Sequence, residues 1–87
     1  MHVKINTAAV DGAEVPISNA AAEAVRMGFN PSSLPRVDQL KALAAAFLSL
    51  CDEVAEDLPE AGREIATAKT TMQTASMWAV LGATKSS

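Results

Sequence analysis

The chain has 87 residues, 49% of them apolar and 20% charged, and its net charge at pH 7 is −3. This length allows one small domain. The chain has one cysteine, Cys51, and one histidine, His2, which excludes an internal disulfide and a usual structural zinc site. Its stability must therefore come from long helices or from assembly with other copies. The acidic balance disfavours DNA as a partner, and the lack of an 18-residue apolar run or a signal peptide predicts a cytoplasmic protein that does not enter a membrane.

Residues 1–17 are expected to form an N-terminal arm. Polar and apolar residues alternate over 2–6 as in a strand, and residues 15–17 read as extended chain. A short hairpin and a floppy arm both fit this pattern.

A short helix and a rigid connector are expected next. Ser18 offers a helix cap, residues 20–27 favour a helix, and Gly28 suits the position just after its C-terminal cap. Two prolines disfavour a helix over 29–35, and the second of them, Pro35, suits the first turn of a new helix.

Two long helices with a short link are the main structural prediction. The first is expected to end near residues 55–57 and the second to run to about Ala83, with Asp57 and Glu60 forming a capping box at the turn. Such helices must be antiparallel neighbours. Each carries apolar or small residues spaced three and four apart, the spacing of a coiled-coil seam: Val37, Leu40, Ala44, Phe47, Cys51 and Val54 on the first, and Ile65, Ala68, Met72, Ala75, Ala79 and Gly82 on the second.

The fold class predicted from these elements is all-α, an antiparallel helical hairpin preceded by a short helix and occupying a domain at 18–87. Residues 77–83 are apolar all round their helix, which is typical of a segment buried on every side. One neighbouring helix covers only one stripe of it. We therefore expect other copies of the chain to cover the rest, in a homo-oligomer.

The residue types needed for catalysis are scarce. His2 lies near a terminus, Cys51 falls on the apolar seam, and neither a Ser-His-Asp set, a glycine-rich phosphate loop nor a metal-spaced cluster occurs, so we expect neither an enzyme nor a metal site. Four threonines form a stripe on the last helix. Their hydroxyls either bond back to carbonyls one turn earlier or line a wall for a polar ligand; the stripe comprises Thr67, Thr70, Thr71 and Thr74.

Charge is unevenly distributed along the hairpin. Residues 52–64, around the turn, carry a local charge of −5, and the remaining chain carries +2. In an antiparallel hairpin turning near residue 59, Lys41 is level with about Met77 and Trp78, at the end remote from those acids. A flat ring beside a cation suits a nucleotide. The plainer alternative makes Lys41 a solvated flank and Trp78 a core residue.

Two short patterns resemble a known family. They are Leu40-Lys41 early in the first long helix, and Arg63 followed over 68–77 by the order Ala, base, Thr, Thr, Met, Gln, Thr, Ala, Ser, Met. From Phe29 to Ala83 the chain resembles the phage anti-CBASS sponges, which sequester cyclic oligonucleotide signals and share their hairpin with anti-Thoeris sponges. The resemblance implies a homohexamer of paired hairpins that needs no cofactor and acts in the cytoplasm of an infected bacterium. It also implies that cyclic dinucleotides, and in some members cyclic trinucleotides, are bound intact between protomers.

The family's binding residues are carried over one position at a time. Lys41 matches the phosphate-contacting lysine, and Phe29 is the expected substitute for a base-stacking tyrosine, because this chain has no tyrosine. Leu81 stands where family members often have an arginine, which argues against a trinucleotide site. The remaining predicted ligand-binding residues were chosen from their positions in the chain: Asn30, Ser32, Ser33, Arg36, Thr70 and Trp78.

The first hypothesis is therefore a sponge that binds cyclic dinucleotides, cyclic trinucleotides or a cyclic ADP-ribose-type signal without cleaving them, and so blocks CBASS signalling. The alternative is a ligand-free helical oligomer that acts as an adaptor for another protein. The two differ in whether nucleotides raise the melting temperature.

Overall fold

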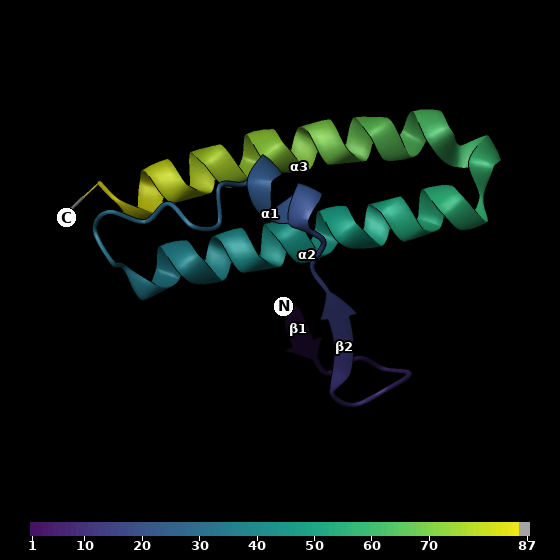
Figure 1. The fold of residues 1–87 in the computed structure, drawn as a ribbon, viewed down its shortest axis with the longest axis horizontal. Coiled ribbons are helices and arrows are strands. Elements are labelled where there is room, and N and C mark those ends of the chain that lie inside the picture. Colours follow the sequence, from purple (N-terminus) through teal and green to yellow (C-terminus); the bar gives the residue numbers. More distant parts are fainter. Residues whose placement is uncertain (86–87) are drawn as a thin grey trace.

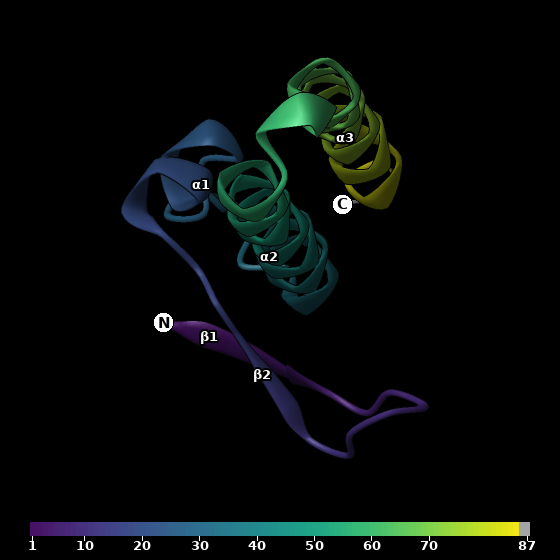
Figure 2. The same ribbon diagram turned by 90° about the vertical axis from the view of Figure 1, so that its right-hand side faces the viewer.

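The computed structural model describes residues 1–85, so the last two residues of the predicted domain 18–87 lie outside the described residues. Helices α2 and α3 run antiparallel, α1 packs against α2, and a β-hairpin projects from another side of α2 (Figures 1 and 2). The predicted helical hairpin is confirmed. The elements in chain order are β1 (His2–Ile5), β2 (Ala13–Pro16), α1 (Asn19–Ala24), α2 (Pro35–Asp57), the 3-10 turn η1 (Pro59–Ala61) and α3 (Gly62–Ala83).

The N-terminal arm is an antiparallel hairpin, the first of the two expected alternatives. Val3 pairs with Val15, and the loop between the strands is tied by the amide of Gly12, which donates to Asn6 Oδ1 at 2.7 Å. Gly12 has a φ of +66°, a conformation that glycine adopts without steric cost. The chain is mostly helical, but the all-α assignment is wrong for this arm, because β2 buries Val15 and thereby holds the hairpin against the helices.

The start of α1 agrees with the sequence prediction. The hydroxyl of Ser18 accepts a hydrogen bond from the amide of Ala21 at 3.1 Å, as expected of a helix cap. The amide of Ser18 donates in turn to Ser49 Oγ at 3.1 Å, and that hydroxyl donates to the carbonyl of Ala45 at 3.0 Å. Ser49 therefore ties the beginning of α1 to the middle of α2.

Replacing Ser49 by alanine is expected to destabilise the fold by about 1–3 kcal/mol, because it leaves the Ser18 amide without its partner in a partly buried place. Urea denaturation followed by circular dichroism measures this change. Ser32→Ala on the exposed connector is the matched control, expected within about 0.5 kcal/mol of the parent. An S49A protein as stable as the control would contradict the assigned role.

The C-terminus of α1 differs from the prediction. The amide of Arg26 donates to the carbonyl of Glu23 at 3.1 Å and that of Met27 to the carbonyl of Ala22 at 2.9 Å, a pair of bonds that closes a helix with a left-handed residue. That residue is Arg26, with a φ of +55°, and not Gly28. The left-handed conformation raises the free energy of a residue with a side chain by roughly 1–2 kcal/mol, so glycine would take the position of Arg26 with less strain.

The predicted capping box at the hairpin turn is wrong. Pro59 opens η1, and α3 begins only at Gly62, with Ala61 as a cap that makes no side-chain hydrogen bond. Since proline has a fixed φ and no N–H, it favours a new tight turn at this point. Asp57 is instead the last residue of α2, and Glu60 lies within η1.

The hydrophobic core lies where β2, α1 and α2 meet. Leu48, 1% exposed, is one of its largest side chains, and Met72 of α3 packs on its edge. Among the described residues of α3, Ser76 alone is buried. The face of α3 towards α2 is otherwise half-buried and includes Ile65, Met72 and Val80. The buried members of the core are Val15, Ile17, Ala21, Val25, Ala44, Ala45, Ala46 and Leu48.

The seam predicted on α2 is only partly buried. Val37, Ala44 and Cys51 are buried, but Phe47 and Val54 are 40% and 39% exposed. The reason is that α1 and α3 cover α2 from neighbouring sides, which draws a different face inward. That face carries Lys41, Ala45, Leu48 and Ser49 in addition.

The seam predicted on α3 is also rotated in its second half. Ile65, Ala68 and Met72 are half-buried, whereas the last three predicted members, Ala75, Ala79 and Gly82, are exposed. Ser76 and Val80 take their places facing α2.

Two apolar surfaces remain uncovered on the single chain. One, the α2 stripe, is spaced four, three and four along its helix and consists of Leu43, Phe47, Leu50 and Val54. The other, the α3 patch, consists of Met77, Trp78 and Leu81, which are 71%, 70% and 51% exposed. The segment expected to be buried on every side is therefore open in one copy. Among residues 1–85, no helix is both long and apolar enough to pass through a membrane.

Candidate functional site

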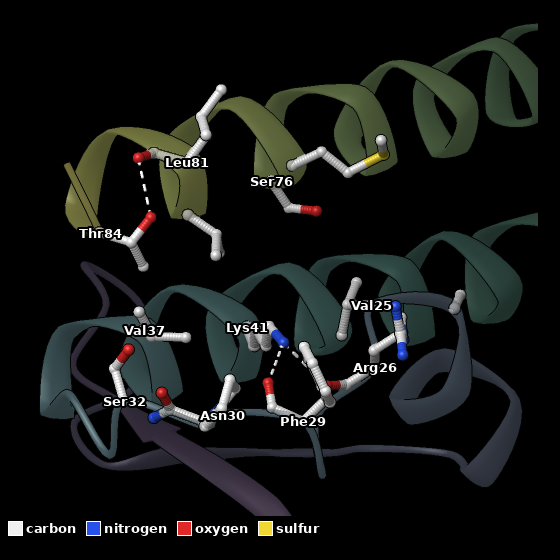
Figure 3. A pocket seen from close by; sticks show the side chains of 14 residues that line it. Val25, Arg26, Phe29, Asn30, Ser32, Val37, Lys41, Ser76, Leu81 and Thr84 are labelled. Atoms are coloured by element: carbon white, nitrogen blue, oxygen red, sulfur yellow. Dashed lines mark hydrogen bonds between the residues drawn. The ribbon is translucent and has the colours of Figure 1, made fainter. Parts of the chain in front are cut away.

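A cavity of about 460 Å³ lies between the connector after α1, the first turns of α2 and the last turns of α3 (Figure 3). Its volume falls within the range of roughly 300–1,000 Å³ usual for small-molecule sites. Three separate segments build it, so it exists only because α3 returns to the start of α2. The lining residues are Ala24, Val25, Arg26, Phe29, Asn30, Pro31, Ser32, Val37, Lys41, Ser76, Met77, Val80, Leu81 and Thr84.

Asn30 holds the connector in place. Its Nδ2 donates to the carbonyl of Leu34 and to Asp38 Oδ1, both at 2.9 Å, and its Oδ1 accepts from the amide of Leu34 at 3.3 Å. Since these bonds use both donors and one acceptor site of the amide, Asn30 acts mainly as a brace for the first turn of α2.

Lys41 is buried beneath the connector, with 7% of its surface exposed. Its ammonium group donates to the carbonyl of Arg26 at 2.9 Å and to the carbonyl of Phe29 (Figure 3). An ammonium group has three N–H donors, so one remains for a ligand in the cavity. The alternative that made Lys41 a solvated flank is wrong.

Phe29 is the one aromatic residue among the described residues that line the cavity, and two cations lie near its ring. The guanidinium carbon of Arg26 lies 4.4 Å from the centroid of the ring, and Lys41 Nζ lies 5.5 Å from it. Both distances are within the range of a cation–π interaction. Half of the Phe29 surface, 51%, is nevertheless exposed, so part of the ring is open to a ligand.

The charge of the cavity opposes that of the chain. Among residues 1–85, none of those that line the cavity carries a carboxylate, whereas Arg26 and Lys41 are both cationic, in a chain of net charge −3. The acidic residues of 52–64 lie at and near the hairpin turn, the opposite end of the molecule (Figure 1). Apolar walls around two cations suit an anion with a flat apolar part.

The structure brings together half of the residues proposed from the sequence. Phe29, Asn30, Ser32 and Lys41 line the cavity, and Lys41 shares it with Met77, as the predicted register of the hairpin implies. The other four are absent from its lining: Thr70 lies in a different hollow beside Asp52 and Lys69, Trp78 lies in the α3 patch, and Ser33 and Arg36 are exposed.

Several lining residues were missed by sequence reasoning. The hairpin register could have indicated Val80 and Leu81, because it places them level with Val37. Arg26 gave no such signal, since its place depends on where α1 ends and on the left-handed turn there. Ser76 also lines the cavity, and its hydroxyl donates to the carbonyl of Gln73 at 2.9 Å.

The threonine stripe is explained by bonds within α3. The hydroxyls of Thr67, Thr71 and Thr74 donate to carbonyls four residues earlier at 3.0, 2.8 and 3.2 Å. For these three residues the first of the two expected alternatives is confirmed.

Cys51 is a core residue, as predicted. It is 6% exposed, and burial, together with the neighbouring Asp52 carboxylate, raises the pKa of its thiol, while the nearby Lys69 acts in the opposite direction. The group is therefore protonated at neutral pH and is a poor nucleophile.

Comparison with known proteins identifies the fold. A search of curated proteins found no match, and a search of solved structures found none. The family model of the Acb2/Tad1 hairpin domain matches residues 19–84, which leaves out the β-hairpin and includes every residue that lines the cavity. The chain thus belongs to the Acb2/Tad1 hairpin-domain family, the phage anti-CBASS and anti-Thoeris sponge proteins, a family associated with sequestering cyclic oligonucleotides.

Proposed function

We propose that this protein binds cyclic oligonucleotide second messengers, cyclic dinucleotides first among them, in the cavity beside Lys41. It holds them without cleaving them and so lowers the concentration available to the effectors of CBASS immunity in the infected cell. The observation that carries this proposal is the pairing of two cations, Arg26 and Lys41, around Phe29 in a cavity whose described lining residues include no carboxylate. Phosphates match the cations, and a nucleobase matches the open part of the ring.

The same proposal includes assembly of several copies into a homo-oligomer. Met77 and Leu81 line the cavity and are also 71% and 51% exposed, so one wall of the site is apolar and open on the single chain. A second copy packed there would bury this apolar surface and enclose the ligand. Binding between copies would also let a roughly two-fold ligand meet the same cations twice.

An adaptor that binds only another protein is the competing function. It would account for the α2 stripe and the α3 patch equally well. It gives no reason for two cations to converge on one aromatic ring in an acidic chain. The sponge proposal explains both features.

Native mass spectrometry of the purified protein with a panel of cyclic di- and trinucleotides and a cyclic ADP-ribose isomer tests the proposal. We expect a homo-oligomer that retains cyclic dinucleotides in a fixed ratio to its subunits, and chromatography of the released ligand should recover it intact. A panel in which no member binds, or a ligand that is returned cleaved, would contradict it.

A further inference from the structure

Arg26 is the lining residue whose presence the fold explains least. It takes the left-handed position at the end of α1, where its φ is +55° and where glycine would avoid the steric cost. The hydrogen bonds that close the helix there come from backbone atoms alone, so they do not require an arginine side chain. A strained residue that its fold does not need is a candidate for a role in binding.

The backbone of Arg26 is held firmly in place. Its carbonyl accepts hydrogen bonds from the amide of Phe29 and from Lys41 Nζ, both at 2.9 Å. The connector therefore cannot shift without breaking a bond to the buried lysine. The guanidinium group begins from this fixed point and lies over the Phe29 ring, at the edge of the cavity (Figure 3).

The side chain of Arg26 is at the same time free to bind. Among residues 1–85 its guanidinium group makes no hydrogen bond or ion pair that competes with a ligand, and its one recorded contact is the stack on Phe29. A guanidinium group stacked on a ring keeps its N–H donors in the plane of the stack, where they point outward. This arrangement matches two oxygens of one phosphate.

From these observations we infer that Arg26 is a second phosphate-binding residue of the site. Its guanidinium group binds a phosphodiester of the ligand through a bidentate hydrogen bond, beside the single free N–H of Lys41. The inference rests on the proposed function and adds a residue to it. Because the phosphodiesters are common to all cyclic dinucleotides, Arg26 contributes affinity irrespective of the base.

Two substitutions test the inference by calorimetric titration with cyclic di-AMP and cyclic di-GMP. Arg26→Gln removes the charge and keeps a long polar side chain, and Arg26→Gly also removes the left-handed strain. Each is expected to weaken binding of both ligands about tenfold or more, as for the loss of a charged hydrogen bond. Arg26→Gly should melt at the same temperature as the parent or higher. Arg63→Gln, on an arginine far from the cavity, is the matched control and should bind like the parent.

The outcomes separate this inference from the proposed function. A parent protein that binds neither of these two ligands overturns the inference, and one that binds no member of the whole nucleotide panel overturns the proposed function as well. A parent that binds while either Arg26 variant binds equally well overturns the inference alone. Weakening restricted to cyclic di-GMP would assign Arg26 to a base and overturn the phosphate contact, and a lower melting temperature for Arg26→Gly would assign it a structural role.

Discussion

Replacing Lys41 by methionine is expected to weaken the binding of cyclic dinucleotides by at least about tenfold and also to destabilise the fold by about 1–3 kcal/mol. The first effect follows from the loss of a cation in the cavity. The second follows because the carbonyls of Arg26 and Phe29 lose the ammonium group that lies between them. Methionine has nearly the length of lysine, so the loss of packing is small.

Calorimetric titration and thermal unfolding of the same preparations measure the two effects, with the titration performed well below the melting temperature of the variant. Lys4→Met on β1, an exposed lysine outside the cavity, is the matched control and should change neither quantity. A folded K41M protein that binds cyclic dinucleotides like the parent would remove Lys41 from the site.

Replacing Phe47 by glutamate is expected to dissociate the proposed homo-oligomer into smaller species while the helices stay folded. Phe47 lies at the centre of the α2 stripe and is 40% exposed on the single chain, so the fold of one copy depends little on it. In an assembly it would be buried, and a carboxylate there would lose its hydration without gaining a partner. Burial of apolar surface contributes about 25 cal/mol per Å², so the substitution would also remove the hydrophobic contribution of Phe47 to the proposed interface.

Light scattering coupled to size-exclusion chromatography measures the mass of each species. Glu53→Lys on the same helix is the control, because Glu53 borders the side of α2 that faces β2 and α1, away from the stripe. It changes the charge more than the test substitution but should leave the mass unaltered. A parent protein that is already monomeric, or an F47E protein with the parent's mass, would contradict the proposed assembly.

The sequence alone was sufficient to predict the helical hairpin and its register. The spacing of apolar residues, Pro35 at the start of α2 and Pro59 at the turn are local signals, and local signals determine where helices begin and end. The register then placed Lys41 level with Met77, and the structure finds both in one cavity. Asn30 and Ser32, proposed from their place at the start of this helix, and Phe29, proposed from the family resemblance, line the same cavity.

Which face of each helix is buried was decided by tertiary packing. The sequence predicts the same burial for Phe47 and Cys51, which both lie on the apolar seam. Because α1 and α3 pack against neighbouring sides of α2, Cys51 is buried and Phe47 stays 40% exposed. Lys41 is buried because the connector after α1 crosses it. No pattern along α2 contains this information, since it depends on how α1 and α3 pack against that helix.

The most informative residue of the site, Arg26, was visible only in the folded chain. Its sequence neighbourhood favoured Gly28 as the end of α1, and the left-handed turn at Arg26 brings its side chain over Phe29 and its carbonyl to Lys41. The sequence thus determined the helices and the chemical character of the site. The convergence of two cations on one ring was decided by tertiary structure, because it depends on how the connector after α1 packs against Lys41 of α2.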